Sequence, residues 1–398
     1  MKKRITTWVL LLMLITAEIC PVTIQGAVQP APEISAPGAV LMEPSTGTVL
    51  YEKNGEEQRS PASITKIMTL LLIFEALEDG QITLEEEAVT SAYAKSMGGS
   101  QVFLEEGEKQ TVETLIKCIV VASGNDASVV MAEHLAGSEE EFVKRMNEKA
   151  RELGMIHTQY VDCCGLTDSD AHYTTASDVA IVSRELITRF PRILNYSSIW
   201  MENIIHRTAQ GEKEFCLTNT NKLIRSYEGC VGLKTGSTSV AKYCVSAVAQ
   251  RGEMTLLAVV MGAPDAKVRF KDAAALLDYG FGKCNLYLDE NRKNPDPVPV
   301  KGGVKKEVAC RYTGEFRYLD TEGKNLSQIE KKIVYMKNLQ APVKKGDIVG
   351  EAQYLLDGKM VGKTDIVAAK SVKKAGLWDY IKHIRKRMIK GDDYSADG

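Results

Sequence analysis

The segment that most constrains the fold is "ASITKIMTLLLIFEAL", residues 62–77, which is apolar on almost every side of a helix. Such a helix has to be buried all round, so other elements must surround it. Ser63 and Lys66 are its chemically useful polar residues, and they lie on one face about a turn apart. With 398 residues and 44% hydrophobic content, the chain is long enough for one large domain and a smaller one.

The neighbouring segments predict a mixed α/β domain of the α+β kind over residues 31–284. "AVLMEPSTGTVLYEKN" alternates around a turn, as a β-hairpin does. Helical segments are expected near 112–122, 127–137, 139–153 and 176–188, and a closing helix should end at Gly280. Three β runs at 230–236, 242–250 and 254–263 indicate an antiparallel sheet flanked by helices plus a helical cluster. After the Pro-rich "NPDPVPVKGGVKKE", short strand-like runs predict a small all-β domain over residues 285–370.

The N-terminus is laid out as a secretory signal peptide. Lys2, Lys3 and Arg4 precede an apolar run from Trp8 to about Ile15, and small and polar residues follow. The run is too short for a bilayer, which takes about 20 apolar residues. We therefore predict a cleaved leader over residues 1–27 and an exported protein, with a short membrane anchor as the alternative.

Composition argues against several other classes of protein. The net charge of −2 provides no basic field, so no nucleic-acid partner is expected. The histidines show no HExxH spacing and no CxxC occurs, so neither a metal site nor a cofactor is expected. Export permits disulfides. Cys118, Cys230 and Cys244 nevertheless lie in apolar segments that suit small core residues, and the pairing stays open.

Ser63 and Lys66 have the spacing of a nucleophile and its base. A serine in the first turn of a helix carries an unpaired backbone N–H at the positive end of the helix dipole. A lysine buried among apolar neighbours loses proton affinity and can act as a base near neutral pH. The S-x-x-K pattern is weak by itself, because it also occurs at Ser239–Lys242 and Ser371–Lys374.

Two further motifs strengthen this interpretation. "SGN", residues 123–125, separates two predicted helices, and "KTG", residues 234–236, opens a β run. Each also has a plain structural explanation, since Ser, Gly and Asn favour turns and a lysine suits a solvated strand end. In this order, and on a helix start, a loop and a strand, the three motifs form the signature of β-lactamases and penicillin-binding proteins.

On these motifs the chain resembles the serine-type D-alanyl-D-alanine carboxypeptidases, which are low-molecular-mass penicillin-binding proteins. The resemblance covers roughly residues 35–370 and includes "TNTNKLIRSYEGCVGLKTGST" and "APVKKGDIVGEAQYLLDGKMVGK". It implies a β-lactamase/transpeptidase-like fold. It also implies hydrolysis of the terminal D-Ala-D-Ala bond of peptidoglycan pentapeptides, control of cross-linking in cell-wall synthesis, and β-lactam inhibitors.

The resemblance implies catalytic roles for three residues. Ser63 would attack the carbonyl between two D-alanines and form an acyl-enzyme, while Lys66 would accept the hydroxyl proton. Ser123 would relay a proton to the departing D-Ala amine. Lys234 would add a positive charge near Lys66 and so help to lower its pKa.

Substrate binding is assigned by the same resemblance to Asn125 and to the third motif. Asn125 would hold the substrate amide, and Lys234 and Thr235 would bind the terminal carboxylate. The backbone N–H groups of Ser63 and Ser237 would form the oxyanion hole. Strand 231–237 would offer an edge to a peptide-like substrate. Many relatives have His or a bulky residue at the position of Ser237, so only its backbone role is expected.

Two other stretches depart from the family pattern or leave alternatives open. "VDCCGL", residues 161–166, stands where the family usually has an Asn-Pro pair, which predicts a different local turn. We interpret Cys163 and Cys164 as structural rather than redox residues. Arg269 aligns with a family arginine near the site, and a surface position on its helix is equally open.

Two other functions compete with the carboxypeptidase. Class A β-lactamases add a glutamate for deacylation, but no E-x-x-L-N pattern occurs between Ser123 and Lys234, and "RILN" has Arg where Glu is needed. Penicillin is therefore expected to inhibit rather than to be turned over. A catalytically idle peptidoglycan-binding scaffold is the second alternative.

The tail "LWDYIKHIRKRMI" spaces Leu377, Ile381, Ile384 and Met388 as one apolar helix stripe within a strongly basic stretch. This pattern predicts an amphipathic helix over residues 371–390 that binds in the plane of an anionic membrane. The alternatives are a helix docked on the second domain and a solvated tail. Together with the leader, the helix predicts a protein at the outer face of the cytoplasmic membrane.

Overall fold

The computed structural model describes residues 30–209, 211–379, 381 and 385. The predicted leader lies outside these residues, and so do residues 380, 382–384 and 386–390 of the predicted tail helix. The predicted hairpin is confirmed: β1 (Gly38–Glu43) and β2 (Thr48–Lys53) pair antiparallel. They form a five-stranded antiparallel sheet of order β2-β1-β9-β8-β7 with β7 (Cys230–Thr238), β8 (Lys242–Arg251) and β9 (Met254–Ala263). The strand β7, which carries the KTG motif, is therefore an edge of this sheet.

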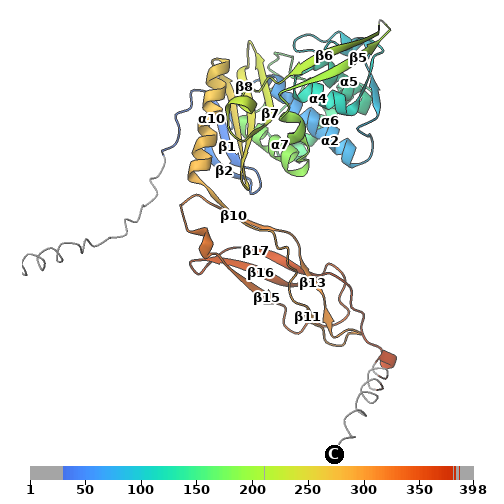
Figure 1. Cartoon of the computed structure of the whole chain (residues 1–398), viewed down its shortest axis with the longest axis vertical. Coiled ribbons are helices and arrows are strands. Elements are labelled where there is room, and N and C mark those ends of the chain that lie inside the picture. Colours follow the sequence, from blue (N-terminus) through green and yellow to red (C-terminus); the bar gives the residue numbers. More distant parts are fainter. Residues whose placement is uncertain (1–29, 210, 380, 382–384, 386–398) are drawn as a thin grey trace, which may run out of the picture. The chain divides into compact units, whose positions relative to one another are not determined.

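Helices cover both faces of the sheet (Figure 1). On one face, α10 (Ala266–Lys283) packs against β9 and β8. The helix ends three residues later than the expected Gly280. On the other, α7 (Ala176–Arg189) packs against β9 and β1 and connects to the helical cluster. The cluster contains α2 (Lys66–Glu78), α4 (Val112–Val120), α5 (Asn125–Ala136) and α6 (Glu139–Glu152). The predicted sheet and helical cluster are thus confirmed.

The apolar segment of residues 62–77 occupies the middle of this cluster. Ile67, Met68 and Ile73 are fully buried although they point in different directions around α2, as the all-round apolar pattern requires. The segment is not one helix, however. A 3₁₀ turn, η1 (Ala62–Thr65), precedes α2. Ser63 therefore lies on this tighter turn, and Lys66 is the first residue of the α-helix.

Several short elements were not predicted. The strands β5 (Met201–Thr208) and β6 (Gly211–Thr218) form a hairpin whose charged, mostly exposed residues give a weak alternation. The strands β3 (Glu87–Val89) and β4 (Lys109–Thr111) are too short to produce a pattern. The remaining short helices of this part are α3 (Ala92–Lys95), α8 (Ile193–Ser197) and α9 (Leu223–Ser226).

The described residues after α10 are built almost entirely from strands, as predicted. Their main sheet has the order β13-β17-β16-β15. Its core contains the stacked rings of Phe316 and Tyr354, with centroids 3.7 Å apart. The elements are β10 (Asn285–Asp289), β11 (Val298–Pro299), β12 (Glu307–Val308), β13 (Cys310–Tyr312), β14 (Phe316–Asp320), η2 (Leu326–Gln328), β15 (Glu330–Tyr335), β16 (Ile348–Leu356) and β17 (Lys359–Ala368).

The cysteines of the described residues are all free thiols, and most of them are buried. Cys118, Cys230 and Cys244 belong to the hydrophobic cores, which confirms the interpretation drawn from their apolar segments. The core positions of these three thiols explain their occurrence without a disulfide.

Candidate active site

The three motifs converge where η1 packs against β7. Gly236 of the KTG motif lies so close to the nucleophile turn that a Cβ atom there would be 2.8 Å from the backbone N of Ser63 and 2.9 Å from that of Ile64. Any side chain at this position would push the strand away from the serine. The glycine therefore allows the backbone of β7 to lie directly beside Ser63, where the second N–H group of an oxyanion hole is needed.

The Lys66 amine is held by three oxygen atoms. Its Nζ lies 3.2 Å from Ser63 Oγ, 2.6 Å from Asn125 Oδ1 and 2.7 Å from the backbone O of Cys164. Lys66 itself is fully buried. The side chain therefore has a single defined position, with its amine beside the hydroxyl of the predicted nucleophile.

A second lysine amine, that of Lys234, is held in a similar way by the other two motifs. The Nζ of Lys234 donates to Ser123 Oγ at 2.9 Å and to the backbone O of Thr235 at 2.8 Å. Ser123 has a left-handed φ of +62° between α4 and α5, a conformation that is uncommon for a residue with a side chain. The tight turn that the SGN motif predicted is therefore present, and it directs the serine hydroxyl to the KTG lysine.

Burial is the main influence on both lysines. It lowers the pKa of Lys66, and the nearby acidic groups, which include the carboxylates of Asp162 and Asp126, act in the opposite direction. Burial also lowers the pKa of Lys234 well below its usual value, and the charges of Lys66 and Arg269 lower it further. The lowered pKa of Lys66 is thus due to burial, and the charge effect between the two lysines acts on Lys234.

Asn125 is fixed at the first turn of α5. Its Oδ1 accepts from Lys66, while its Nδ2 donates to the backbone O of Gly98 at 2.7 Å. Its backbone N donates to Ser100 O at 2.8 Å. The segment that contains Gly98 and Ser100 therefore lies against the site, and sequence reasoning did not identify it.

Thr235 has a partner that sequence reasoning also did not single out. Its Oγ1 lies 2.7 Å from Oγ1 of Thr220, which belongs to the loop after β6. The interaction fixes the Thr235 hydroxyl beside Lys234 at the edge of the sheet. Ser237, two residues further along β7, is exposed, as its expected backbone role permits.

Comparison with known proteins fits this arrangement. The chain matches the D-alanyl-D-alanine carboxypeptidase family over residues 25–265 and the C-terminal domain of penicillin-binding protein 5 over residues 282–374. D-alanyl-D-alanine carboxypeptidase DacF of Bacillus subtilis is 41% identical over 348 residues, which cover 87% of this chain and 88% of the relative. The chain belongs to the D-alanyl-D-alanine carboxypeptidase family.

Other members extend the comparison. D-alanyl-D-alanine carboxypeptidase DacC of Escherichia coli is 32% identical over 372 residues, which cover 88% of each chain. Penicillin-binding protein 5 from Haemophilus influenzae superposes with a TM-score of 0.71 at 30% identity, covering 87% of this chain and 100% of that one. The family, the fold class and the enzyme class predicted from the sequence, a penicillin-binding serine D-Ala-D-Ala carboxypeptidase, are confirmed.

The other two S-x-x-K copies lack this environment. Lys242 and Lys374 are both exposed, whereas Lys66 is fully buried. Burial, which the four-letter pattern does not encode, separates the carboxypeptidase motif from its copies.

Arg269 belongs to the site region and not to the surface. It is only 7% exposed, and its Nη1 donates to the backbone O of Gly236 and of Cys244, each at 3.2 Å. Burial lowers its pKa to about 10. Of the two positions left open by the sequence, the one near the site is confirmed. The guanidinium of Arg269 bonds to the backbone of the KTG strand.

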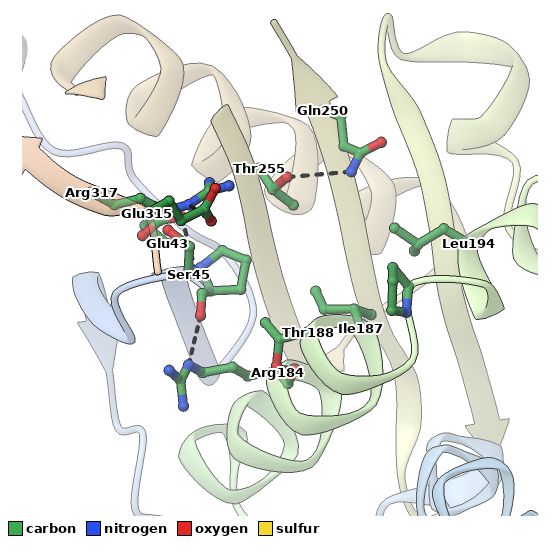
Figure 2. Close-up of a pocket in the computed structure, with 12 residues that line it drawn as sticks. Glu43, Ser45, Arg184, Ile187, Thr188, Leu194, Gln250, Thr255, Glu315 and Arg317 are labelled. Carbon is green, nitrogen blue, oxygen red and sulfur yellow. Dashed lines mark hydrogen bonds and ion pairs between the residues drawn. The ribbon is translucent and has the colours of Figure 1, made fainter. Parts of the chain in front are cut away.

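A separate cavity lies away from these motifs. Its lining includes Arg184, Ile187 and Thr188 of α7 (Figure 2). The Nε atom of Arg184 donates to the backbone O of Pro44 at 2.6 Å, which ties α7 to the β1–β2 turn. No residue of the three motifs lines it. A carboxypeptidase substrate that reaches Ser63 therefore binds elsewhere.

Proposed function

We propose that Ser63 is the nucleophile with which this carboxypeptidase cleaves the terminal D-Ala-D-Ala bond of peptidoglycan stem peptides. The observation that carries the proposal is the buried Lys66 amine beside the Ser63 hydroxyl. A neutral lysine amine has two hydrogens and one lone pair. If Asn125 Oδ1 and Cys164 O accept those two hydrogens, the lone pair is directed toward Ser63 Oγ.

Proton transfer then follows from the contacts. As the Ser63 oxygen bonds to the substrate carbonyl, its proton passes to Lys66. When the tetrahedral intermediate collapses, the C–N bond to the last D-alanine breaks, and the leaving amine takes the proton that Lys66 had accepted, relayed through Ser123, whose hydroxyl contacts Lys234. Water then attacks the acyl-enzyme while Lys66 accepts one of its protons. The C–O bond to Ser63 breaks, and the Ser63 oxygen takes that proton back from Lys66.

Binding of the substrate uses the edge strand. The terminal carboxylate is drawn to Lys234 and to the Thr235 hydroxyl, and Asn125 holds the amide. The developing oxyanion is stabilised by the backbone N–H groups of Ser63 and Ser237, and the contact of Gly236 with the nucleophile turn supports this placement. The peptide extends along the free edge of β7 as an added strand.

The test measures D-alanine released from a peptide that ends in D-Ala-D-Ala. Wild type should release it, and Ser63→Ala should not. Ser371→Ala is the matched control, because it removes the serine of a decoy motif and should leave release intact. Wild-type release that persists in Ser63→Ala would refute the assignment. Absence of release from wild type would favour the idle scaffold.

The β-lactamase alternative is separated by the fate of penicillin. The carboxypeptidase should form a long-lived penicilloyl-enzyme and hydrolyse at most a few equivalents. Sustained turnover of penicillin, detected as continuing loss of β-lactam absorbance far beyond a few equivalents, would show an efficient deacylation step. That result would favour a β-lactamase.

We also propose that the protein is exported and that its C-terminal helix rests on an anionic membrane. The large side chains of Leu377 and Trp378 are 75% and 74% exposed. Within the described part of the chain, no helix has the length and apolarity needed to span a bilayer. Burial of these side chains in the interface, together with the basic residues around them, would attach the protein without a membrane-spanning segment.

The matching experiment is co-sedimentation with vesicles. Val372 is buried and pairs with Val343, and Lys374 pairs with Gly303. These residues belong to the strand-rich part after α10, so the deletion should begin at residue 376 to leave that part intact. The full chain should sediment with phosphatidylglycerol vesicles and not with neutral ones, and the protein lacking residues 376–398 should stay in solution. Equal retention of the two proteins would exclude this role of the helix.

A further inference from the structure

A buried carboxylate organises the turn that departs from the family pattern. Asp162 is only 7% exposed, and its Oδ1 accepts from the backbone N of Cys164 at 2.9 Å and from the backbone N of Gly165. Its Oδ2 accepts from the backbone N of Thr167 at 2.9 Å. One side chain thus fixes the backbone of three residues in the segment 162–167.

This turn contacts Lys66 and the residue that precedes Ser63. The backbone O of Cys164 accepts from the Lys66 amine at 2.7 Å, and that of Cys163 accepts from the Thr69 hydroxyl at 2.5 Å. At Gly165, with a φ of +74°, an added Cβ would lie 1.8 Å from the backbone O of Ala62, next to Ser63. The turn therefore packs directly against both η1 and the start of α2.

We propose that Asp162 is a positioning residue for Lys66, acting through the Cys164 carbonyl that it holds in place. The proposal rests on the proposed role of Lys66 as the base. Without the carboxylate, the segment 162–167 loses three fixed N–H groups, and the carbonyl is free to turn away. The lysine amine then loses one of the two acceptors that direct its lone pair to Ser63.

The contacts favour this role over two others. Glu139, Asp162 and Cys164 bring possible metal-ligand atoms within 4.8 Å of one another, but both carboxylates already accept backbone N–H groups of the turn. The adjacent thiols are fully buried, and burial raises the pKa of Cys163 well above its usual value. A buried, protonated thiol is unreactive. The structure therefore supports the structural interpretation of the two cysteines.

The Asp162 carboxylate also acts on Lys66 through its charge. It faces the lysine from the turn, Asp126 faces it from α5, and the cation Lys234 faces it from β7. His172, also packed here, bonds to Thr65 at 2.9 Å through Nε2, and burial lowers its pKa, which keeps it neutral at pH 7. Since a nearby negative charge raises the pKa of Lys66, removal of the Asp162 charge should lower it.

The test uses Asp162→Ala, Asp162→Asn and the matched control Asp170→Asn, which removes an exposed carboxylate nearby in the sequence. The rate of acylation by a fluorescent penicillin is measured from pH 5 to pH 10, with thermal unfolding in parallel. Asp162→Asn keeps a carbonyl oxygen for Cys164 and Gly165, and loses the acceptor for Thr167 and the charge. Asp162→Asn should therefore separate the effect of the turn geometry on acylation from the effect of the Asp162 charge on the pKa of Lys66.

We expect Asp162→Ala to be acylated roughly 10- to 100-fold more slowly, because small displacements of a catalytic group are costly. Asp162→Asn should recover most of this loss, and the acid limb of its pH profile should move to lower pH. Asp170→Asn should match wild type in both respects.

Two results would overturn the positioning role. One is acylation of Asp162→Ala at the wild-type rate throughout the pH range. The other is an Asp162→Asn profile with an unmoved acid limb and a loss equal to that of Asp162→Ala, which would indicate general support of the fold. If Asp162→Ala does not fold, the profile of Asp162→Asn decides. A wild-type protein that is not labelled at Ser63 would instead overturn the proposed function.

Discussion

The region around Ser63 and the strand-rich region after residue 284 bury different kinds of side chain. The first buries two lysines, Lys66 and Lys234, together with the polar groups that contact them. The described core of the second consists mainly of valines and aromatic rings, and its buried polar residues include Asp320 and Thr364. Burial of charge is costly unless partners compensate for it. The comparison indicates that the first core is shaped for chemistry and the second for stability.

The largest expected effect is on Lys66. Lys66→Ala removes the base, and penicillin acylation should slow by roughly 10²–10⁴-fold, the usual contribution of general acid–base catalysis. In wild type, acylation should rise with pH as Lys66 loses its proton. Because burial lowers the pKa of Lys66, this limb should lie below the pKa of 10.5 of an ordinary lysine. The measurement is the acylation rate as a function of pH.

The matched control is Lys242→Ala, which removes an exposed lysine of a decoy motif and should leave the rate unchanged. Equal rates for the two variants would contradict the view that burial selects the base. A wild-type acid limb centred at or above the ordinary lysine pKa would do the same.

A smaller effect is expected for Thr220→Val. The substitution removes the hydroxyl that bonds to Thr235 and keeps the shape of the side chain. A hydrogen bond between neutral groups is worth about 0.5–1.5 kcal/mol. The value of kcat/KM for a D-Ala-D-Ala peptide should therefore fall roughly threefold to tenfold, mainly through KM. Thr218→Val, at the exposed end of β6, is the control and should leave kcat/KM unchanged. An equal fall in kcat/KM for this variant would contradict the role of Thr220 as the partner of Thr235.

No change in acylation is expected for Tyr354→Ala, which should act on stability alone. Tyr354 is fully buried, stacks on Phe316 and bonds to Asp289 at 3.0 Å. Loss of a buried aromatic side chain costs about 3–5 kcal/mol of unfolding free energy, which thermal unfolding measures. Tyr354→Phe keeps the ring and loses the hydrogen bond to the Asp289 carboxylate, so it should lose only about 1.5–3 kcal/mol. Slower acylation in folded Tyr354→Ala would contradict the view that the strand-rich region contributes to stability and not to acylation.

Much of the fold could be predicted from the sequence because its main elements have strong patterns. The all-round apolar helix, the hairpin at residues 39–54 and the consecutive β runs are each specified by local periodicity. The β5–β6 hairpin was missed because its strands are largely exposed, and the few buried residues, Ile204, His206 and Leu217, give only a weak alternation. The 3₁₀ turn at Ser63 could not be told from the first turn of an α-helix, because the two have the same apolar residues.

The candidate site divides along a similar line. Ser63, Lys66 and the residues of the SGN and KTG motifs could be found because the proposed chemistry uses their side chains. Cys164 contributes through its backbone carbonyl, which every residue type has, so its contact with Lys66 leaves no signal in the sequence. Asp162 acts through that carbonyl, so no sequence pattern marks its role either. Thr220 lies within the family-like stretch "TNTNKLI", which was the available clue.

The central claim is that the three motifs assemble a serine nucleophile at Ser63. It is tested most directly by incubating the full chain with penicillin, digesting it and locating the penicilloyl adduct by mass spectrometry. The account predicts a single adduct on the peptide that contains Ser63, and none in Ser63→Ala. An adduct on another residue, or its persistence in Ser63→Ala, would contradict it.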